Sequence, residues 1–111
     1  MPHNARPVHE VKAQMFRVLG HPARVRILEL LRDGERSVGA LRLELELDSG
    51  GTSQHLAALR RIGLVTSRRE GTSVYYRIDD PRVFDLLADA RDIISRQLAE
   101  QRSLLDALEA E

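Results

Sequence analysis

Hydrophobic positions recur with a helical period along the first third of the chain. Apolar residues in 8–19 stand three or four positions apart, which gives a helix one apolar face. Gly20 ends this first predicted helix, and Pro22 suits the first position of a second helix that ends near Gly34. Because the second helix is apolar on most sides, we expect it to lie centrally. Residues 1–7 hold two prolines and no periodic pattern, which predicts a flexible arm.

Two shorter helices and a β-hairpin follow in the middle of the chain. Ser37 is a favourable N-cap for a short third helix, and Asp48 is one for a fourth helix over about 49–62. The runs LVTSRRE and SVYYRI, rich in β-branched and aromatic residues, flank a Gly-Thr pair. This pattern predicts a β-hairpin over about 65–78.

Apolar positions resume at helical spacing over about 81–108. Pro81 suits the first helical position, with Asp79 or Asp80 as the cap before it. A helix of that length would span about 42 Å, whereas a small domain is only about 30 Å across. Its far half therefore needs a second chain to cover its apolar stripe, which predicts a homodimer held by the first and last helices. The expected interface residues are Val11, Met15, Leu87, Ala90, Ile94 and Leu98.

The composition limits the class of protein. With 111 residues, 42% hydrophobic and 31% charged, the chain suits one domain over 8–111, mainly α with a β-hairpin. No apolar run approaches the roughly 20 residues of a membrane span, and the N-terminus resembles no secretion signal, so we expect a cytoplasmic protein without membrane partners. The absence of cysteine excludes disulfides, thiolate metal ligands and thiol redox sensing. No catalytic motif is found, so we expect no enzyme.

The net charge of zero conceals an uneven distribution along the chain. Residues 36–77 carry seven bases against four acids, whereas 78–111 carry four bases against nine acids. All bases except Lys12 are arginine, the residue best suited to phosphates and base edges. A biased genome composition would produce the same arginine excess. The basic middle of the chain indicates a surface that meets an anion.

The third and fourth helices, joined by a polar turn at 46–48, form a helix-turn-helix candidate. In such motifs the first residues of the second helix reach base edges in the major groove, where Gln54 could pair with adenine. Gly50 and Gly51 either let the backbone approach a phosphate or form a weak first turn. The expected DNA-binding residues are Ser49, Gly50, Thr52, Ser53, Gln54, His55, Arg60, Arg61, Arg68, Arg69, Thr72 and Arg77.

Three motifs in this order, HPARVRIL, SQHLAALRRIGLV and RREGTSVYYRI, resemble the ArsR family of winged helix-turn-helix regulators. The resemblance runs from about Met15 to Ile78. It implies the element order α-α-α-α-β-β-α and a homodimer built from the first and last helices. It also implies that the helix from Ser49 reads the major groove of operator DNA, while the hairpin around Gly71 touches the backbone. Many family members are repressors that a metal ion releases from DNA.

The chain departs from the metal sites that this family is known for. The stretch 43–48, which corresponds to the family's cysteine pair, holds no cysteine, and the last helix holds no histidine. We expect His21 to be structural. The acidic face of the last helix, which suits only hard ions, is interpreted as solvated. It consists of Asp85, Asp89 and Asp92.

The remaining metal candidates are His3 and His9 in and beside the arm, which are either solvated or effector ligands. Imidazole and oxygen donors without sulfur favour Ni(II) or Zn(II), which would act as an effector and not as a folding cofactor. The leading hypothesis is a dimeric repressor whose operator binding responds to such a metal. The alternatives are a regulator of the same family that does not respond to metals, and a protein-interaction module that uses the winged helix without DNA.

Overall fold

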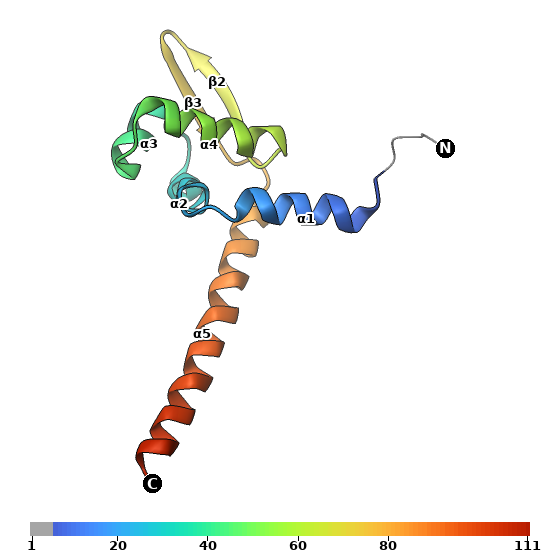
Figure 1. Cartoon of the computed structure of the whole chain (residues 1–111). Helices are drawn as coiled ribbons and strands as arrows, with labels where there is room; N and C mark the ends of the chain where they lie inside the picture. Colours follow the sequence, from blue (N-terminus) through green and yellow to red (C-terminus); the bar gives the residue numbers. More distant parts are fainter. Residues whose placement is uncertain (1–5) are drawn as a thin grey trace. The chain divides into compact units, whose positions relative to one another are not determined.

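A computed structural model describes residues 6–111, which group into two compact units, one ending at Asp80 and one beginning at Pro81. The first unit contains α1 (Val8–Leu19), α2 (Pro22–Leu30), the short 3-10 helix η1 (Leu31–Asp33), β1 (Arg36–Ser37), α3 (Val38–Leu45), α4 (Ser49–Arg61), β2 (Thr66–Glu70) and β3 (Ser73–Arg77) (Figure 1). The second unit is the helix α5 (Arg82–Glu109). The fold is mainly helical with an antiparallel wing, as predicted. The expectation of one domain over 8–111 stays a prediction.

Side-chain caps fix where the two central helices begin. The Ser37 hydroxyl accepts a hydrogen bond from the Ala40 amide at 3.1 Å, and the Asp48 carboxylate accepts one from the Gly51 amide at 2.6 Å. Both caps satisfy amides that a helix start leaves unpaired, and both were predicted. Between the helices, Glu46 adopts a left-handed conformation with φ of 55°, which makes the turn tight. These features set the angle at which α4 leaves α3.

The wing is a three-stranded antiparallel sheet in the order β1-β3-β2. Strands β2 and β3 form the predicted hairpin, and Gly71 at its tip has φ of 61°, a conformation that glycine adopts without strain. Strand β1 was not predicted. It is only two residues long, pairs Arg36 with Tyr76, and ends at Ser37, the α3 cap. A strand this short gives no alternation of apolar and polar residues in the sequence.

The core of the first unit lies where α2, α3 and α4 meet. Tyr76 also turns into this core, whereas Tyr75 is half-buried. Ile62, at the end of the predicted fourth helix, is only half-buried, because it caps the C-terminus of α4 beyond the last turn. The largest fully buried apolar side chains are Ile27, Leu28, Leu31, Leu41, Leu56, Leu59 and Val65.

Helix α5 has 28 residues and begins one residue later than expected. Pro81 itself occupies the N-cap position, without a side-chain cap hydrogen bond, so the prediction that Asp79 or Asp80 is the N-cap is wrong. The Asp79 carboxylate instead accepts hydrogen bonds from the Arg77 Nε at 2.7 Å and the Thr66 hydroxyl at 3.0 Å. Among residues 6–111 no helix is long and apolar enough to cross a membrane. The exposed large apolar side chains of α5 are Ile93, Ile94, Leu98, Leu104, Leu105 and Leu108.

Candidate nucleic-acid interface

Helix α4 carries two faces of opposite character. Leu56 and Leu59 are fully buried against the rest of the first unit, whereas Gly50, Ser53 and Gln54 are exposed. The exposed residues lie in the first two turns, where a recognition helix meets base edges. They are small or carry hydrogen-bonding groups, so nothing bulky blocks the approach of this surface to a groove. The side chain of Ser49, also predicted to bind DNA, lies outside the described part of the structure.

Thr52 does not belong to this exposed surface. Its side chain is fully buried, and its hydroxyl donates a hydrogen bond to the Asp48 carbonyl at 3.0 Å. The prediction that Thr52 contacts DNA is therefore wrong. The helical period explains the difference, because Thr52 lies four residues before Leu56 and shares its inward face. The sequence alone suggested a polar contact because threonine is a common phosphate ligand.

Gly51 has a structural explanation within the first turn of α4. A Cβ atom built on this glycine would lie 2.9 Å from the Asp48 carboxylate oxygen that caps the helix. Any larger residue would therefore require the Asp48 carboxylate to shift. A Cβ on Gly50 would meet the same carboxylate oxygen only at 3.9 Å, an ordinary contact. The cap thus accounts for Gly51 without DNA, and it leaves Gly50 unexplained.

His55 joins α4 to the start of α2. Its Nδ1 accepts a hydrogen bond from the Arg24 Nε at 3.2 Å, and its ring centroid lies 4.3 Å from that of His21. Burial lowers the pKa of His55 below 6.5, and the nearby His21 and Arg24 lower it further. His21 has the structural role expected of it, because its Nδ1 accepts from the Ala23 amide at the start of α2. The DNA contact predicted for His55 stays a prediction, and this packing role is the alternative.

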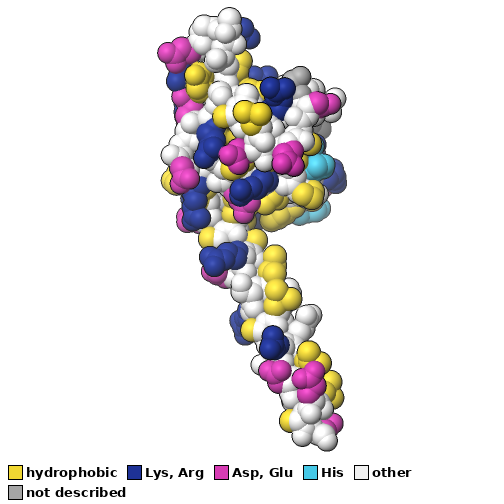
Figure 2. Space-filling model, turned by 90° about the vertical axis from the view of Figure 1, so that its left-hand side faces the viewer, with side chains coloured by type: hydrophobic (Ala, Val, Ile, Leu, Met, Phe, Trp, Pro, Cys, Tyr) yellow, Lys and Arg dark blue, Asp and Glu magenta, His cyan; other side chains and the backbone are white. Residues whose placement is uncertain are grey.

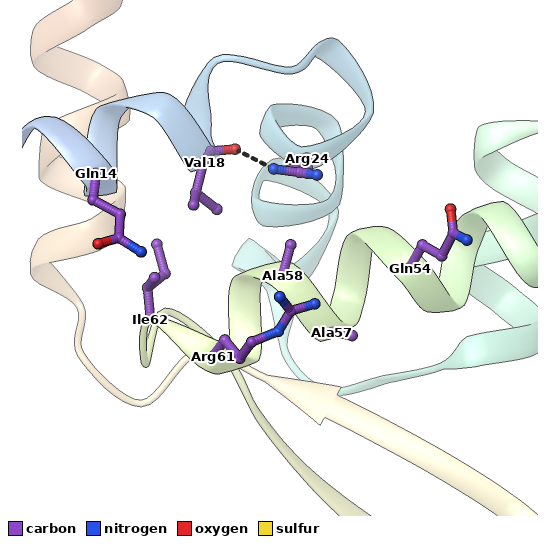
Figure 3. Close-up of a pocket in the computed structure, with 8 residues that line it drawn as sticks. All are labelled: Gln14, Val18, Arg24, Gln54, Ala57, Ala58, Arg61 and Ile62. Carbon is purple, nitrogen blue, oxygen red and sulfur yellow. Dashed lines mark hydrogen bonds between the residues drawn. The ribbon is translucent and has the colours of Figure 1, made fainter.

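A cleft of about 470 Å³ runs along α4, opposite α1 and the start of α2 (Figure 3). Its lining includes the guanidinium groups of Arg24 and Arg61, the small side chains of Ala57 and Ala58, and Gln54 at one end. Arg24 is held in place because its Nη1 also donates to the Val18 carbonyl at 3.2 Å. No acidic side chain lines this cleft in the described part of the chain. One flank of the recognition face is therefore positively charged.

The wing arginines differ in how far they are neutralised. Arg68 donates to both carboxylate oxygens of Glu35 and to Glu70, and Arg77 donates to Asp79. Arg69 is exposed, and within residues 6–111 the structure places no carboxylate at ion-pairing distance from it. Thr72 is exposed at the wing tip. Of the three wing arginines predicted to bind DNA, only Arg69 carries a positive charge that no carboxylate offsets.

Arg60 and Arg61, both predicted to bind DNA, are exposed in the last turn of α4. The Arg60 Nη1 lies 3.4 Å from the Ser67 hydroxyl on β2, an uncharged partner. Arg61 lines the cleft beside α1. Together with Arg69, they give the surface around α4 three guanidinium groups that can attract phosphates.

The predicted metal ligands are not gathered into a site in the described residues. Within residues 6–111, no three histidine or acidic side chains are placed to hold a metal ion. His9 is exposed in the first turn of α1, and His3 lies outside the described part of the chain. Asp85, Asp89 and Asp92 are exposed on α5. The metal prediction for His3 and His9 therefore stays a prediction.

The predicted dimer surfaces are available in the single chain. Val11 on α1 and Ala90, Ile94 and Leu98 on α5 are exposed, whereas Met15 and Leu87 are half-buried. Figure 2 shows apolar side chains in yellow following one side of α5, between patches of charge. Such a contiguous apolar surface on a water-exposed helix is typical of a protein interface.

Two residues of the site are marked by no local pattern in the sequence. Glu35 neutralises Arg68, and Arg24 holds His55, but each partner lies more than 30 positions away along the chain. No local pattern marks such pairs. The register of β1 against β3 places Glu35 next to Arg77, but β1 is too short to be predicted from the sequence.

Comparisons with known proteins agree with this geometry. Residues 21–67 match the sequence model described as "Bacterial regulatory protein, arsR family". The chain is 44% identical over 105 residues to the uncharacterized HTH-type transcriptional regulator Rv0081 of Mycobacterium tuberculosis, covering 94% of this chain and 92% of that protein. The crystal structure of Rv0081 superposes with a TM-score of 0.80, covering 87% of this chain and 98% of the other.

Two further relatives bear on assembly and regulation. A homodimeric winged helix-turn-helix DNA-binding domain, Mb0332 of Mycobacterium bovis, is 33% identical with a TM-score of 0.74, covering 88% and 94% of the two chains. A probable mercury resistance operon repressor of Streptomyces lividans is 34% identical, covering 76% of this chain and 66% of that protein. These relatives are regulators, which confirms the prediction that the chain is not an enzyme. The chain belongs to the ArsR family of DNA-binding transcriptional regulators.

Proposed function

We propose that this chain is a homodimeric repressor that binds operator DNA through α4 and the wing. The observation that carries the proposal is the composition of the exposed face of α4. Gly50, Ser53 and Gln54 supply small and hydrogen-bonding groups, while Arg60 and Arg61 supply charge at the end of the same helix. Phosphate contacts give affinity and base contacts give sequence preference, and this surface offers both.

Dimerisation completes the proposed interface. A two-fold axis would present two copies of α4 to half-sites one helical turn apart, about 34 Å. The exposed apolar side chains of α1 and α5 support such an assembly, as does the homodimeric Mb0332 relative. The name of the Streptomyces lividans relative supports repression as the mode of regulation.

The test of DNA binding is a salt titration by fluorescence anisotropy, on a duplex selected from a random pool and on a scrambled duplex. A specific regulator binds the selected duplex about 10³-fold or more tightly, and its affinity falls steeply with salt. Equal affinity for both duplexes would contradict a sequence-specific regulator. No binding at low salt would favour the protein-interaction module.

The effector part of the proposal is that Ni(II) or Zn(II) releases the protein from its operator through His3 or His9. Two observations support it: imidazole is the strongest transition-metal donor among the nitrogen and oxygen groups of this cysteine-free chain, and one relative is named for mercury resistance. Isothermal titration should show binding that weakens as pH falls through about 6.5, where imidazole is protonated.

The matched variant for the effector is His3→Ala combined with His9→Ala, with His21 left intact. Loss of metal binding in this variant would support the arm as the site. Unchanged metal affinity would move the site elsewhere, with Asp85, Asp89 and Asp92 as the next candidates. If the parent protein binds neither ion, it is a family member that does not respond to these metals.

A further inference from the structure

The strand register divides the wing arginines between two faces. Arg68 pairs with Tyr75 across the hairpin, and Arg69 pairs with Val74. Side chains alternate along a strand, so Arg68, Tyr75 and Arg77 share one face, here called the outer face. Arg69 lies on the opposite, inner face, the one from which Tyr76 enters the core. Neighbouring arginines in the sequence are therefore not equivalent on the surface.

The outer face holds a charge cluster that neutralises its arginines. The Arg68 Nε donates to the two Glu35 carboxylate oxygens at 3.0 and 2.9 Å, and the Arg68 Nη1 donates to Glu70 at 2.7 Å. The Arg68 guanidinium also lies 4.7 Å from the centroid of the Tyr75 ring. Arg77 donates to Asp79 at 2.7 Å, and its Nη1 is 4.0 Å from Glu35. Two guanidinium groups thus face three carboxylates.

Glu35 is the member of this cluster that comes from outside the hairpin. It immediately precedes β1, whose Arg36 pairs with Tyr76, so the register continues to place Glu35 beside Arg77. Hydrogen bonding from Arg68 lowers the pKa of Glu35, so this carboxylate stays ionised to a lower pH than an unpaired glutamate does. Glu35 therefore contacts both outer-face arginines and ties them to the helical part of the unit.

The inner face carries positive charge without such partners. Ser67, which shares this face with Arg69, lies 3.4 Å from the Nη1 of Arg60 on α4. In the described part of the chain, neither Arg60 nor Arg69 has a carboxylate at ion-pairing distance. The two arginines flank the junction between the wing and the proposed recognition helix.

We propose that Glu35 is a positioning and specificity-determining residue of the DNA interface. By holding Arg68 and Arg77 on the outer face, it leaves Arg69 of the wing, with Arg60 of α4, to bind phosphate. An arginine already bound to two carboxylates must give up those bonds to reach a phosphate, so it adds little net affinity. Non-specific binding is reduced as a result, and α4 keeps control of sequence preference. This inference rests on the proposed DNA-binding function.

The experiment compares the salt dependence of DNA binding in single variants. Log affinity falls with log salt, and each phosphate that is neutralised on duplex DNA adds about 0.9 to the magnitude of this slope. All changes of slope below refer to its magnitude. Glu35→Gln should steepen this slope by up to about 1, because Arg68 keeps only Glu70 as a partner and Arg77 only Asp79. It should also reduce the ratio of specific to non-specific affinity. Arg69→Gln should lower the slope by about 0.9, whereas Arg68→Gln should leave it unchanged.

Glu29→Gln is the matched control, because it removes the same charge from an exposed ion pair with Arg26 on α2. Its slope should equal that of the parent. The proposal is wrong if Glu35→Gln leaves the slope unchanged in a folded protein, as judged by its amide NMR spectrum. It is also wrong if Arg68→Gln lowers the slope as much as Arg69→Gln does.

A measurement without DNA separates this inference from the proposed function. Carboxyl NMR should show Glu35 titrating below its ordinary value of 4.5 in the parent, and close to it in Arg68→Gln. An ordinary pKa of Glu35 in the parent would show that the charge cluster is not formed in solution, and the inference would be wrong. A low value in a parent that binds no DNA would confirm the cluster but overturn the proposed function, and with it the role of Glu35.

Discussion

The apolar stripe of α5 predicts how much the free energy of dimerisation depends on its side chains. The variant combines Ile94→Glu with Leu98→Glu, one helical turn apart on the stripe. Their side chains are 55% and 59% exposed in the single chain. Full burial of such a residue is worth about 1.5–3 kcal/mol, so covering the exposed part is worth about 1 kcal/mol. A two-fold dimer contains two copies of each residue, so four side chains are covered and the total is about 4 kcal/mol.

The expected loss is large enough to see directly. About 4 kcal/mol corresponds to a roughly 1000-fold increase in the dimer dissociation constant. Four glutamates brought together in one seam would weaken the dimer further. In sedimentation velocity at about 10 μM, the parent should sediment at twice its chain mass of 12.6 kDa, and the variant at the chain mass.

The control places the same charges on the other side of the helix. Ala99→Glu with Ser103→Glu adds two carboxylates about half a turn away from the stripe, at positions that are exposed. This protein should remain dimeric. If the Ile94 and Leu98 variant sediments as a dimer, the interface lies elsewhere. If both variants dissociate, added charge and not the stripe is responsible, which equally refutes the reasoning.

Three further predictions concern the helix α4. Gln54→Ala should cost about 1–3 kcal/mol of operator affinity and relax preference at one base pair, measured by anisotropy on a panel of single-base variants. Asp48→Ala should lower the free energy of unfolding by about 0.5–2 kcal/mol in urea titrations, whereas Asp48→Asn keeps the cap and most of the stability. His55 has a folded-state pKa below its unfolded value of 6.5, so the unfolded chain takes up its proton first and stability falls as pH drops below 6.5. The free energy of unfolding should fall by at most about 1.4 kcal/mol per pH unit. This fall should be absent in His55→Gln, because Glu35 and Asp79 titrate only at lower pH. Equal pH profiles for the parent and His55→Gln would contradict the prediction.

Local signals predicted most of the fold. The glycine at position 20, the caps at Ser37 and Asp48, and the alternating runs of the hairpin each depend on a few neighbouring residues. The helix and hairpin boundaries could therefore be predicted to within one or two residues, except that the second helix ends as an α-helix at Leu30 and continues to Asp33 as the 3-10 helix η1. Strand β1 could not, because its two residues pair with a segment 40 positions away.

The site was harder to predict than the fold. Residue type suggested that Thr52 and all three wing arginines meet DNA, yet burial removes Thr52 and carboxylates neutralise Arg68 and Arg77. Residue type gives the chemistry that a side chain can perform. Which face it occupies depends on the phase of α4 and on the register of the sheet.

The register of the wing also constrains how its length can change. In a strand, the insertion of one residue moves every following side chain to the opposite face. One extra residue before Arg68 in β2 would move Arg68 to the inner face and Arg69 to the outer face, so the carboxylates would face the wrong arginine. Insertions at the wing tip beyond Glu70 leave that parity intact on β2. Variation in wing length is therefore tolerated at the tip, and within the strand only in steps of two residues.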